Sequence, residues 1–152
     1  MKINTKSRYS VRIMTYLADH ASVEKPVSLN EISKKQKISQ RYLEQLIVPL
    51  KISGLVKSVS GKYGGHYLNR KPSAVSLYDI IVASSGEIKL IDCVKNPNSC
   101  EFYKKCNARE IWELVNTHIV DILKDFTLED LSQKKLKLKR HSKIGKWLKV
   151  RC

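Results

Sequence analysis

The sequence of 152 residues has no long apolar run, and this absence limits where the protein can work. No stretch approaches the roughly 18 apolar residues that a membrane-spanning helix needs. The opening MKINTKSRYSVRIM contains lysines but neither an apolar core segment nor a small-residue cleavage site, so no secretory signal is expected. We therefore expect a cytoplasmic protein with no membrane partner.

Sequence motifs of catalysis are also missing. There is no recognisable Ser/His/Asp set, metal-hydrolase motif or phosphate-binding loop. The glycine-rich stretch GKYGG has the wrong spacing for a phosphate loop, and no helix is predicted to start after it. We therefore expect that the protein is not an enzyme.

Acidic residues are scarce and unevenly distributed in a chain of net charge +15. Residues 1–71 hold fourteen Lys/Arg against four Asp/Glu, residues 72–130 hold six against ten, and residues 131–152 hold nine against none. A basic first half beside an acidic middle indicates that one part binds a polyanion, with a merely solvated basic face as the alternative. Residues 132–152 are expected to form a disordered basic arm that adds attraction to DNA, with a membrane-surface helix as the alternative.

Apolar residues recurring every three or four positions predict helices in the first half. Ser28 and Glu31 have the spacing of a capping box at one helix start, and Ser39 precedes a second helix, QRYLEQLIVPLKISG. The tight connection between these helices predicts a helix-turn-helix motif, with an ordinary helical hairpin as the alternative. The second helix is expected to bury Leu43, Leu46, Ile47 and Leu50.

A hairpin is predicted directly after this motif. In LVKSVSGKYGGHYLNR, residues that favour strands flank the glycines, and the tip is cationic and aromatic. A hairpin in this place reads as the wing of a winged helix. The expected fold class is therefore mainly α with a small β-hairpin wing, in which residues 1–86 form a winged helix-turn-helix domain for DNA binding.

The second half is expected to hold a loop and a long helix. Residues 87–106 are the loop, and residues 107–131 carry an apolar stripe at helical spacing that exceeds what one small domain can cover. Such a helix most simply pairs with its copy in a second subunit, so a homodimer is expected. His118 within the stripe is expected at the interface rather than as a metal ligand.

The stretch CVKNPNSCEFYKKC holds three of the four cysteines. Its intervals of six and five residues disfavour structural zinc, which usually contains a C-x2–4-C knuckle, and a disulfide would leave one thiol over. Two readings remain open. Free thiols could sense oxidants in the positive field of Lys95, Lys104 and Lys105, or converging thiolates could hold an iron–sulfur cluster.

These features together resemble the Rrf2 family of bacterial winged-helix transcription regulators. The similar stretches are MKINTKSRYSVRIM, ISQRYLEQL, SGLVKSVSGKYGGHYL, the three-cysteine loop and FTLEDL, which together cover about residues 1–131. The family includes iron–sulfur cluster regulators, nitric-oxide-sensing repressors and cysteine metabolism repressors. The resemblance implies a homodimer that binds double-stranded DNA at a pseudo-palindromic operator.

The resemblance also implies site residues. Cys93, Cys100 and Cys106 would ligate an iron–sulfur cluster, for which the [2Fe–2S] type is expected ahead of [4Fe–4S]. Arg41, Glu44 and Gln45 would read bases. The full set implied for DNA binding is Ser28, Ser39, Gln40, Arg41, Tyr42, Glu44, Gln45, Lys62, Tyr63, Gly64, Gly65 and His66.

The sequence departs from the family pattern at the expected fourth ligand. Arg109 stands where cluster regulators have a histidine, and Arg8 stands where the nitric-oxide sensor has an aspartate. The fourth ligand is therefore unassigned among Glu110, Glu101, Asp92, an N-terminal group of the partner subunit and a small exogenous molecule. The alternative function is a cluster-free repressor controlled by a partner protein or by thiol oxidation.

Overall fold

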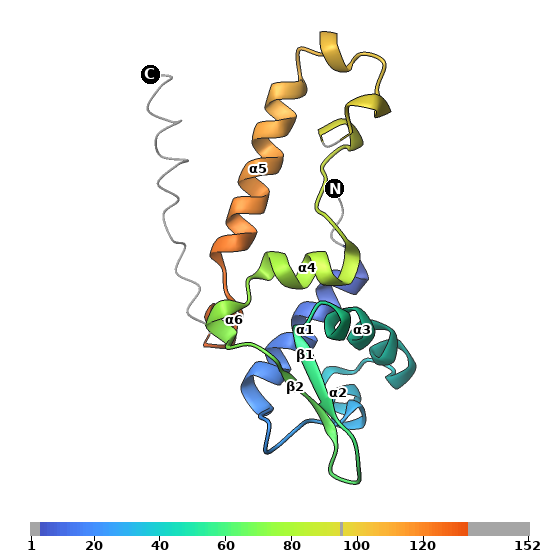
Figure 1. Ribbon diagram of the computed structural model, residues 1–152, viewed down its shortest axis with the longest axis vertical. Coiled ribbons are helices and arrows are strands. Elements are labelled where there is room, and N and C mark those ends of the chain that lie inside the picture. Colours follow the sequence, from blue (N-terminus) through green and yellow to red (C-terminus); the bar gives the residue numbers. More distant parts are fainter. Residues whose placement is uncertain (1–3, 95, 134–152) are drawn as a thin grey trace.

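The computed structural model describes residues 4–94 and 96–133, so Lys95 and residues 134–152 of the predicted basic tail lie outside it. The described part is mainly helical with one two-stranded antiparallel hairpin, which confirms the predicted fold class (Figure 1). The elements in chain order are α1 (Thr5–His20), α2 (Leu29–Gln36), α3 (Gln40–Ile52), β1 (Val56–Val59), β2 (Gly65–Leu68), α4 (Leu77–Ser85), α5 (Arg109–Asp125) and α6 (Leu128–Ser132).

The core of the winged-helix domain lies where α1, α3 and α4 meet beside the hairpin. All four side chains predicted to face inward from α3 are buried, so this part of the pattern is confirmed. Apolar residues at helical spacing form one face of each helix, and their burial removes that face from water. The largest fully buried side chains are Ile13, Met14, Leu17, Ile32, Leu43, Leu46, Leu50, Leu55, Ile80 and Leu128.

The connection between α2 and α3 is short and locally stabilised. Lys37 ends α2 in a left-handed conformation with φ 53°, and its N–H donates to the Ser33 carbonyl. The predicted cap at Ser28 is confirmed, since its Oγ accepts from the Glu31 N–H at 3.2 Å. The Glu31 carboxylate instead accepts from the Tyr16 hydroxyl at 2.9 Å, which ties α2 to α1. These contacts stabilise both ends of α2 and hold it on α1.

The hairpin forms the wing and is anchored by a third segment. β1 and β2 pair from Val56↔Leu68 to Val59↔Gly65. Val27, which precedes α2, exchanges two backbone hydrogen bonds with His66, at 3.0 and 2.8 Å. The wing is therefore joined to the start of the helix-turn-helix by main-chain pairing.

The predicted helix over 107–131 is divided in two, which is a correction to the sequence interpretation. α5 ends at Asp125, Phe126 and Thr127 are extended, and α6 begins at Leu128 with Thr127 as its N-cap. Thr127 and Asp130 form a capping box, in which each side chain accepts from the other residue's backbone N–H. Leu128 then lies fully buried in the winged-helix core, and the Ser132 hydroxyl donates to Asp19 on α1. A capped new start and an apolar anchor thus end the long helix early.

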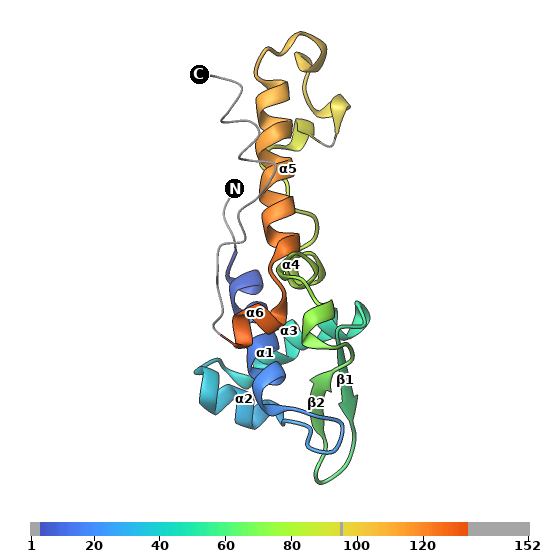
Figure 2. The ribbon, with the colours of Figure 1, turned by 90° about the vertical axis from the view of Figure 1, so that its left-hand side faces the viewer.

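α5 extends away from the winged-helix domain, and the segment after α4 runs along it before turning back (Figures 1 and 2). Asn116 is the one fully buried residue among those of α5. Within the described ranges, no helix has the length and apolar character needed to cross a bilayer. α5 is therefore a projecting arm with three exposed apolar residues, Ile111, Trp112 and Val115, while its other apolar residues are half-buried.

Candidate DNA-binding surface and cysteine loop

The outer face of α3 presents polar side chains to solvent. Helical spacing places them opposite the four buried apolar residues, so burial of one face exposes the other. Arg41 offers a fork of donors that matches guanine, while Glu44 can accept from cytosine. Ser39 is the N-cap residue as predicted, but its side chain makes no capping hydrogen bond. The exposed residues of the predicted set here are Ser39, Gln40, Arg41, Glu44 and Gln45.

Tyr42 has a structural task on the same helix. It is half-buried, and its ring meets the Tyr9 ring edge-on, with centroids 5.9 Å apart and planes 80° apart. The Arg12 guanidinium lies 5.3 Å from the Tyr9 centroid and donates to the Gln36 carbonyl at 2.5 Å. Tyr42 therefore orients α3 on α1, and Ser28 at the start of α2 is exposed with its hydroxyl used in capping.

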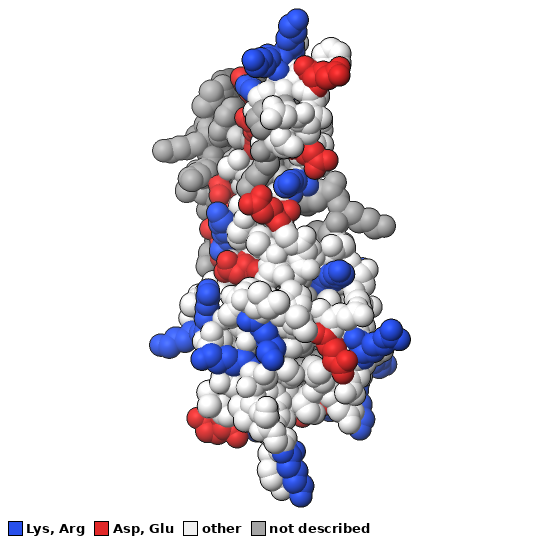
Figure 3. All heavy atoms as spheres, turned by 45° about the vertical axis from the view of Figure 1, so that its right-hand side comes forward, with Lys and Arg blue, Asp and Glu red and all other residues white. Residues whose placement is uncertain are grey.

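The wing tip is exposed and cationic. The Tyr63 side chain is 84% exposed, and the Lys62 Nζ lies 5.7 Å from its ring centroid. Figure 3 shows more Lys and Arg than Asp and Glu side chains over the lower half of one face, with a few acidic side chains among them. Such a distribution suits a polyanion at the winged-helix end of the molecule.

The two wing glycines are explained by close backbone approach. A Cβ on Gly64 would lie 2.3 Å from the Val59 carbonyl oxygen, and one on Gly65 would lie 2.6 Å from the carbonyl of Val27. Any other residue would push the hairpin apart or detach it from the segment before α2. These positions are therefore fixed by the fold, whether or not they also contact DNA.

His66 lies at the base of the wing rather than at its tip. Its backbone N–H and C=O both pair with Val27, and its ring Nδ1 is buried without a hydrogen-bond partner. Burial lowers the pKa of His66, and the nearby Lys51 charge lowers it further. The half-buried ring packs at the base of the wing, and contact of His66 with DNA stays a prediction.

The three cysteines lie in successive short turns. Cys93 is inside the 3-10 turn η2 (Asp92–Val94), Cys100 follows η3 (Pro97–Ser99), and Cys106 follows η4 (Tyr103–Lys105). All three are half-buried free thiols. Thiolates are the ligands that iron–sulfur clusters take, so the donor type fits. The geometry does not, because the described residues include no group of three or more His, Cys, Asp or Glu that could hold a metal ion.

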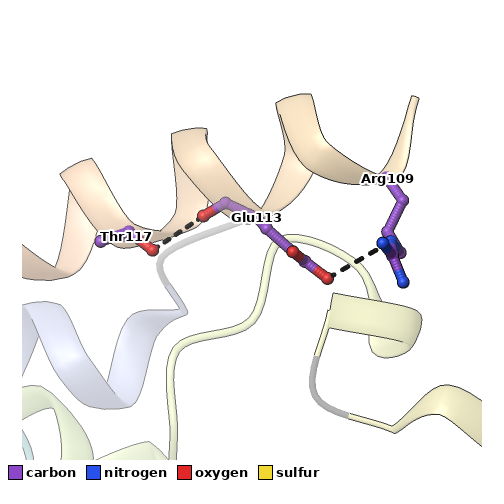
Figure 4. A network of polar contacts seen from close by, with 3 residues as sticks. All are labelled: Arg109, Glu113 and Thr117. Carbon is purple, nitrogen blue, oxygen red and sulfur yellow. Dashed lines mark hydrogen bonds and ion pairs between the residues drawn. The ribbon is translucent and has the colours of Figure 1, made fainter. Parts of the chain in front are cut away.

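Arg109 is engaged in contacts of its own at the exit of this loop. Its guanidinium lies 4.9 Å from the Tyr103 ring centroid, and its Nε lies 3.7 Å from Glu113 Oε1 (Figure 4). Its backbone N–H donates to the Cys106 carbonyl at 3.3 Å. The residue that replaces the family's histidine ligand therefore joins the last turn of the loop to the first turns of α5.

Asn116 is a residue that the sequence reasoning missed. Its side chain is 5% exposed, and its Oδ1 accepts from the Leu90 N–H at 3.0 Å. Leu90 belongs to the segment that enters the cysteine loop, so α5 holds the loop near both ends. The signal available in the sequence was an amide among apolar residues of the helix, with Trp112, Ile119 and Val120 at helical spacing from it.

Comparison with known proteins is consistent with this architecture. The Rrf2 family profile, described as an iron-dependent transcriptional regulator, matches residues 3–134. The transcriptional regulator CymR of Bacillus subtilis is 38% identical over 132 residues, which cover 87% of this chain and 90% of that protein. The regulator IscR of Pectobacterium atrosepticum is 35% identical over 135 residues, which cover 89% and 81%.

Solved structures show the same relationship. The structure of CymR, the global cysteine regulator of B. subtilis, superposes with a TM-score of 0.73 over 88% of this chain and 98% of that one, at 38% identity. IscR of T. potens superposes with a TM-score of 0.69 over 93% of both chains, at 35% identity. The matched length spans the winged helix, the cysteine loop and α5. The chain therefore belongs to the Rrf2 family, whose members are DNA-binding transcription regulators and not enzymes.

Proposed function

We propose that the protein is a homodimeric regulator that binds a pseudo-palindromic operator in the cytoplasm, with affinity set by the state of the cysteine loop. The observation that carries the proposal is the exposed polar face of α3, with Arg41, Glu44 and Gln45, on a helix-turn-helix with an exposed cationic wing. α3 would enter the major groove, and Lys62 would contact the backbone. Two such helices in a dimer would read half-sites about 34 Å apart.

The two faces of α5 support the dimer. Ile111, Val115 and Ile122 lie along one side of the helix, and Arg109, Glu113 and Asn116 lie along the opposite side. The loop contacts the second side through its bonds to Asn116 and Arg109. Ile111 is 60% and Val115 38% exposed on the first side. Since the loop holds the opposite side, the apolar stripe is open to the same stripe of a second copy.

An iron–sulfur cluster on Cys93, Cys100 and Cys106 is the first candidate input, with [2Fe–2S] ahead of [4Fe–4S]. It is supported by the donor type and by the family's description as iron-dependent. When bound, such a cluster supplies a centre that reacts with oxidants and nitric oxide. The described conformation does not gather the three thiols, so no step of the mechanism is assigned to the cluster.

Thiol chemistry or a partner protein, without a cluster, is the second candidate. It is favoured by the separate, half-buried thiols and by the similarity to a protein named as a cysteine regulator. The thiolate is the reactive form of a cysteine. A thiolate that attacks hydrogen peroxide forms an S–O bond as the O–O bond breaks, giving a sulfenic acid and a hydroxide ion.

One set of measurements tests both inputs. Anaerobically purified protein would be assayed for iron, sulfide and visible absorption beside Cys100→Ala. A duplex selected from a random DNA library would then be titrated with reduced metal-free, iron- and sulfide-reconstituted, and peroxide-treated protein. Iron, sulfide and absorption bands lost in Cys100→Ala support the cluster, and peroxide-dependent affinity of iron-free protein supports thiol chemistry. Selection of no duplex by any form would contradict the assignment to DNA.

A further inference from the structure

α5 is firmly fixed at its base. The Leu77 N–H donates to the Phe126 carbonyl and the Leu128 N–H to the Val75 carbonyl, both at 2.8 Å. These bonds lie between two capping boxes, one that starts α4 and one that starts α6. A movement of α5 is therefore passed to α4 and α6, which both pack on α1 in the DNA-binding domain.

The far part of α5 is held to the cysteine loop at two unequal points. At the exit, Arg109 is about one-third exposed and its ion pair spans 3.7 Å, a geometry of little energetic weight in water. At the entry, the Leu90 N–H and Asn116 Oδ1 form a 3.0 Å bond on a side chain that is 5% exposed. Breaking that bond would leave a buried amide unpaired, which makes it the stronger of the two points.

The entry point is also close to the loop chemistry. Leu90 precedes η2, and η2 contains Cys93 and packs against α5. Before Leu90, the linker residues Glu87, Ile88 and Lys89 line a pocket of about 240 Å³ between α1, α4 and α5. The pocket leaves space in which the linker can shift. A change at Cys93 can therefore displace Leu90 and, through its bond to Asn116, the far part of α5.

We propose that Asn116 is the positioning residue that couples the cysteine loop to α5 and so to the DNA-binding domain. The loop entry moves, the buried Leu90–Asn116 bond carries the displacement into α5, and the joint at Phe126 passes it to α4 and α6. The proposal rests on the proposed function, in which the state of the loop sets operator affinity. It assigns Asn116 no contact with DNA, metal or thiol.

The local bond is tested by amide hydrogen exchange on the full chain. Asn116→Leu keeps most of the packing volume and removes the acceptor, and Asn116→Ala is a second variant if the first does not fold. Either should speed exchange at the Leu90 amide by about five- to tenfold, the equivalent of one lost hydrogen bond. Thr117→Ala is the matched control, since its exposed hydroxyl bonds only within α5, to the Glu113 carbonyl. Unchanged exchange at Leu90 in both Asn116 variants would overturn the proposal.

The coupling is tested by the ratio of operator affinities between two states of each protein. Wild type, Asn116→Leu and Thr117→Ala would each be titrated with the selected duplex, reduced and metal-free, then reconstituted with iron and sulfide or treated with peroxide. We expect the ratio to fall to near one in Asn116→Leu while the reduced-state affinity stays within about twofold, and to stay at the wild-type value in Thr117→Ala. A wild-type-sized ratio in Asn116→Leu would refute the coupling. A ratio of one in wild type itself would instead refute the proposed regulation by the loop.

Discussion

α3 and α5 are both amphipathic, yet they end up in different surroundings. The apolar side of α3 is buried in the domain that it helps to form, whereas Ile111 and Val115 on the apolar side of α5 are exposed within the described chain. The difference follows from position, because α3 is surrounded by α1, α2, α4 and the wing, while α5 projects from the domain. An apolar stripe therefore predicts that one face of a helix is buried, but it does not show whether the same chain or a second subunit buries it.

The largest effect is expected when charged residues replace exposed apolar residues of α5. The double variant Ile111→Glu, Val115→Glu should convert the dimer to a monomer, because two carboxylates cannot be buried against their own copies. Affinity for a two-half-site operator should fall about 100-fold or more through loss of the linked second contact. Sedimentation velocity and DNA titration measure the two effects. Helical content by circular dichroism should be nearly unchanged, and an intact dimer would contradict the assignment of this face.

A substitution on the buried apolar face of α3 should instead lower the stability of the fold. Leu46→Ala on α3 removes a fully enclosed side chain and should lower the free energy of unfolding by about 2 to 5 kcal/mol. Urea denaturation followed by circular dichroism would measure the loss. Val48→Ala on the exposed side of the same helix is the matched control and should cost less than about 0.5 kcal/mol. Equal losses of unfolding free energy in the two variants would contradict the burial of this face of α3.

Substitutions on the outer side of α3 and on the wing should change DNA binding rather than stability. Arg41→Ala should cost about 1 to 3 kcal/mol of binding and relax base preference at one position of each half-site. Lys62→Ala should weaken all sequences alike and reduce the slope of log affinity against log salt concentration by about 1. Titrations over several salt concentrations with matched and mutated duplexes separate these outcomes. A sequence-selective effect of Lys62→Ala would place the wing on base edges.

The smallest expected effect concerns pH. His66 has a pKa below its ordinary value of 6.5 in the folded protein, so the unfolded chain binds more protons as the pH falls. Stability should therefore be complete above pH 6.5 and decline as the pH falls below it. Because the ring is only half-buried, we expect this group to lower Tm by about 2 °C or less between pH 7.5 and 5.5. His66→Phe should remove that part of the pH dependence of Tm in thermal scans. If Tm of the variant falls as much as that of the wild type or more, other groups cause the pH dependence.

The sequence was a good guide where one local pattern decides the structure. The inward residues of α3, the cap at Ser28 and the hairpin around the glycines all follow from spacing and turn chemistry, and the structure confirms them. The end of α5 at Asp125 was not foreseen, because helical periodicity continues through Phe126 while the capping box at Thr127 overrides it. The bond of Asn116 to Leu90 and the backbone pairing of His66 with Val27 were missed because both depend on partners distant in the chain.

Phe126 and Thr127, the two extended residues between α5 and α6, make α5 a lever. With 17 residues the helix is about 25 Å long, so a rotation of roughly 5° at its base moves the far tip by about 2 Å. In a dimer whose two levers are joined along their sides, the same rotation tilts the two DNA-reading ends relative to each other. In the proposed regulation, the length of α5 would therefore set how small a change at the cysteine loop could alter operator affinity.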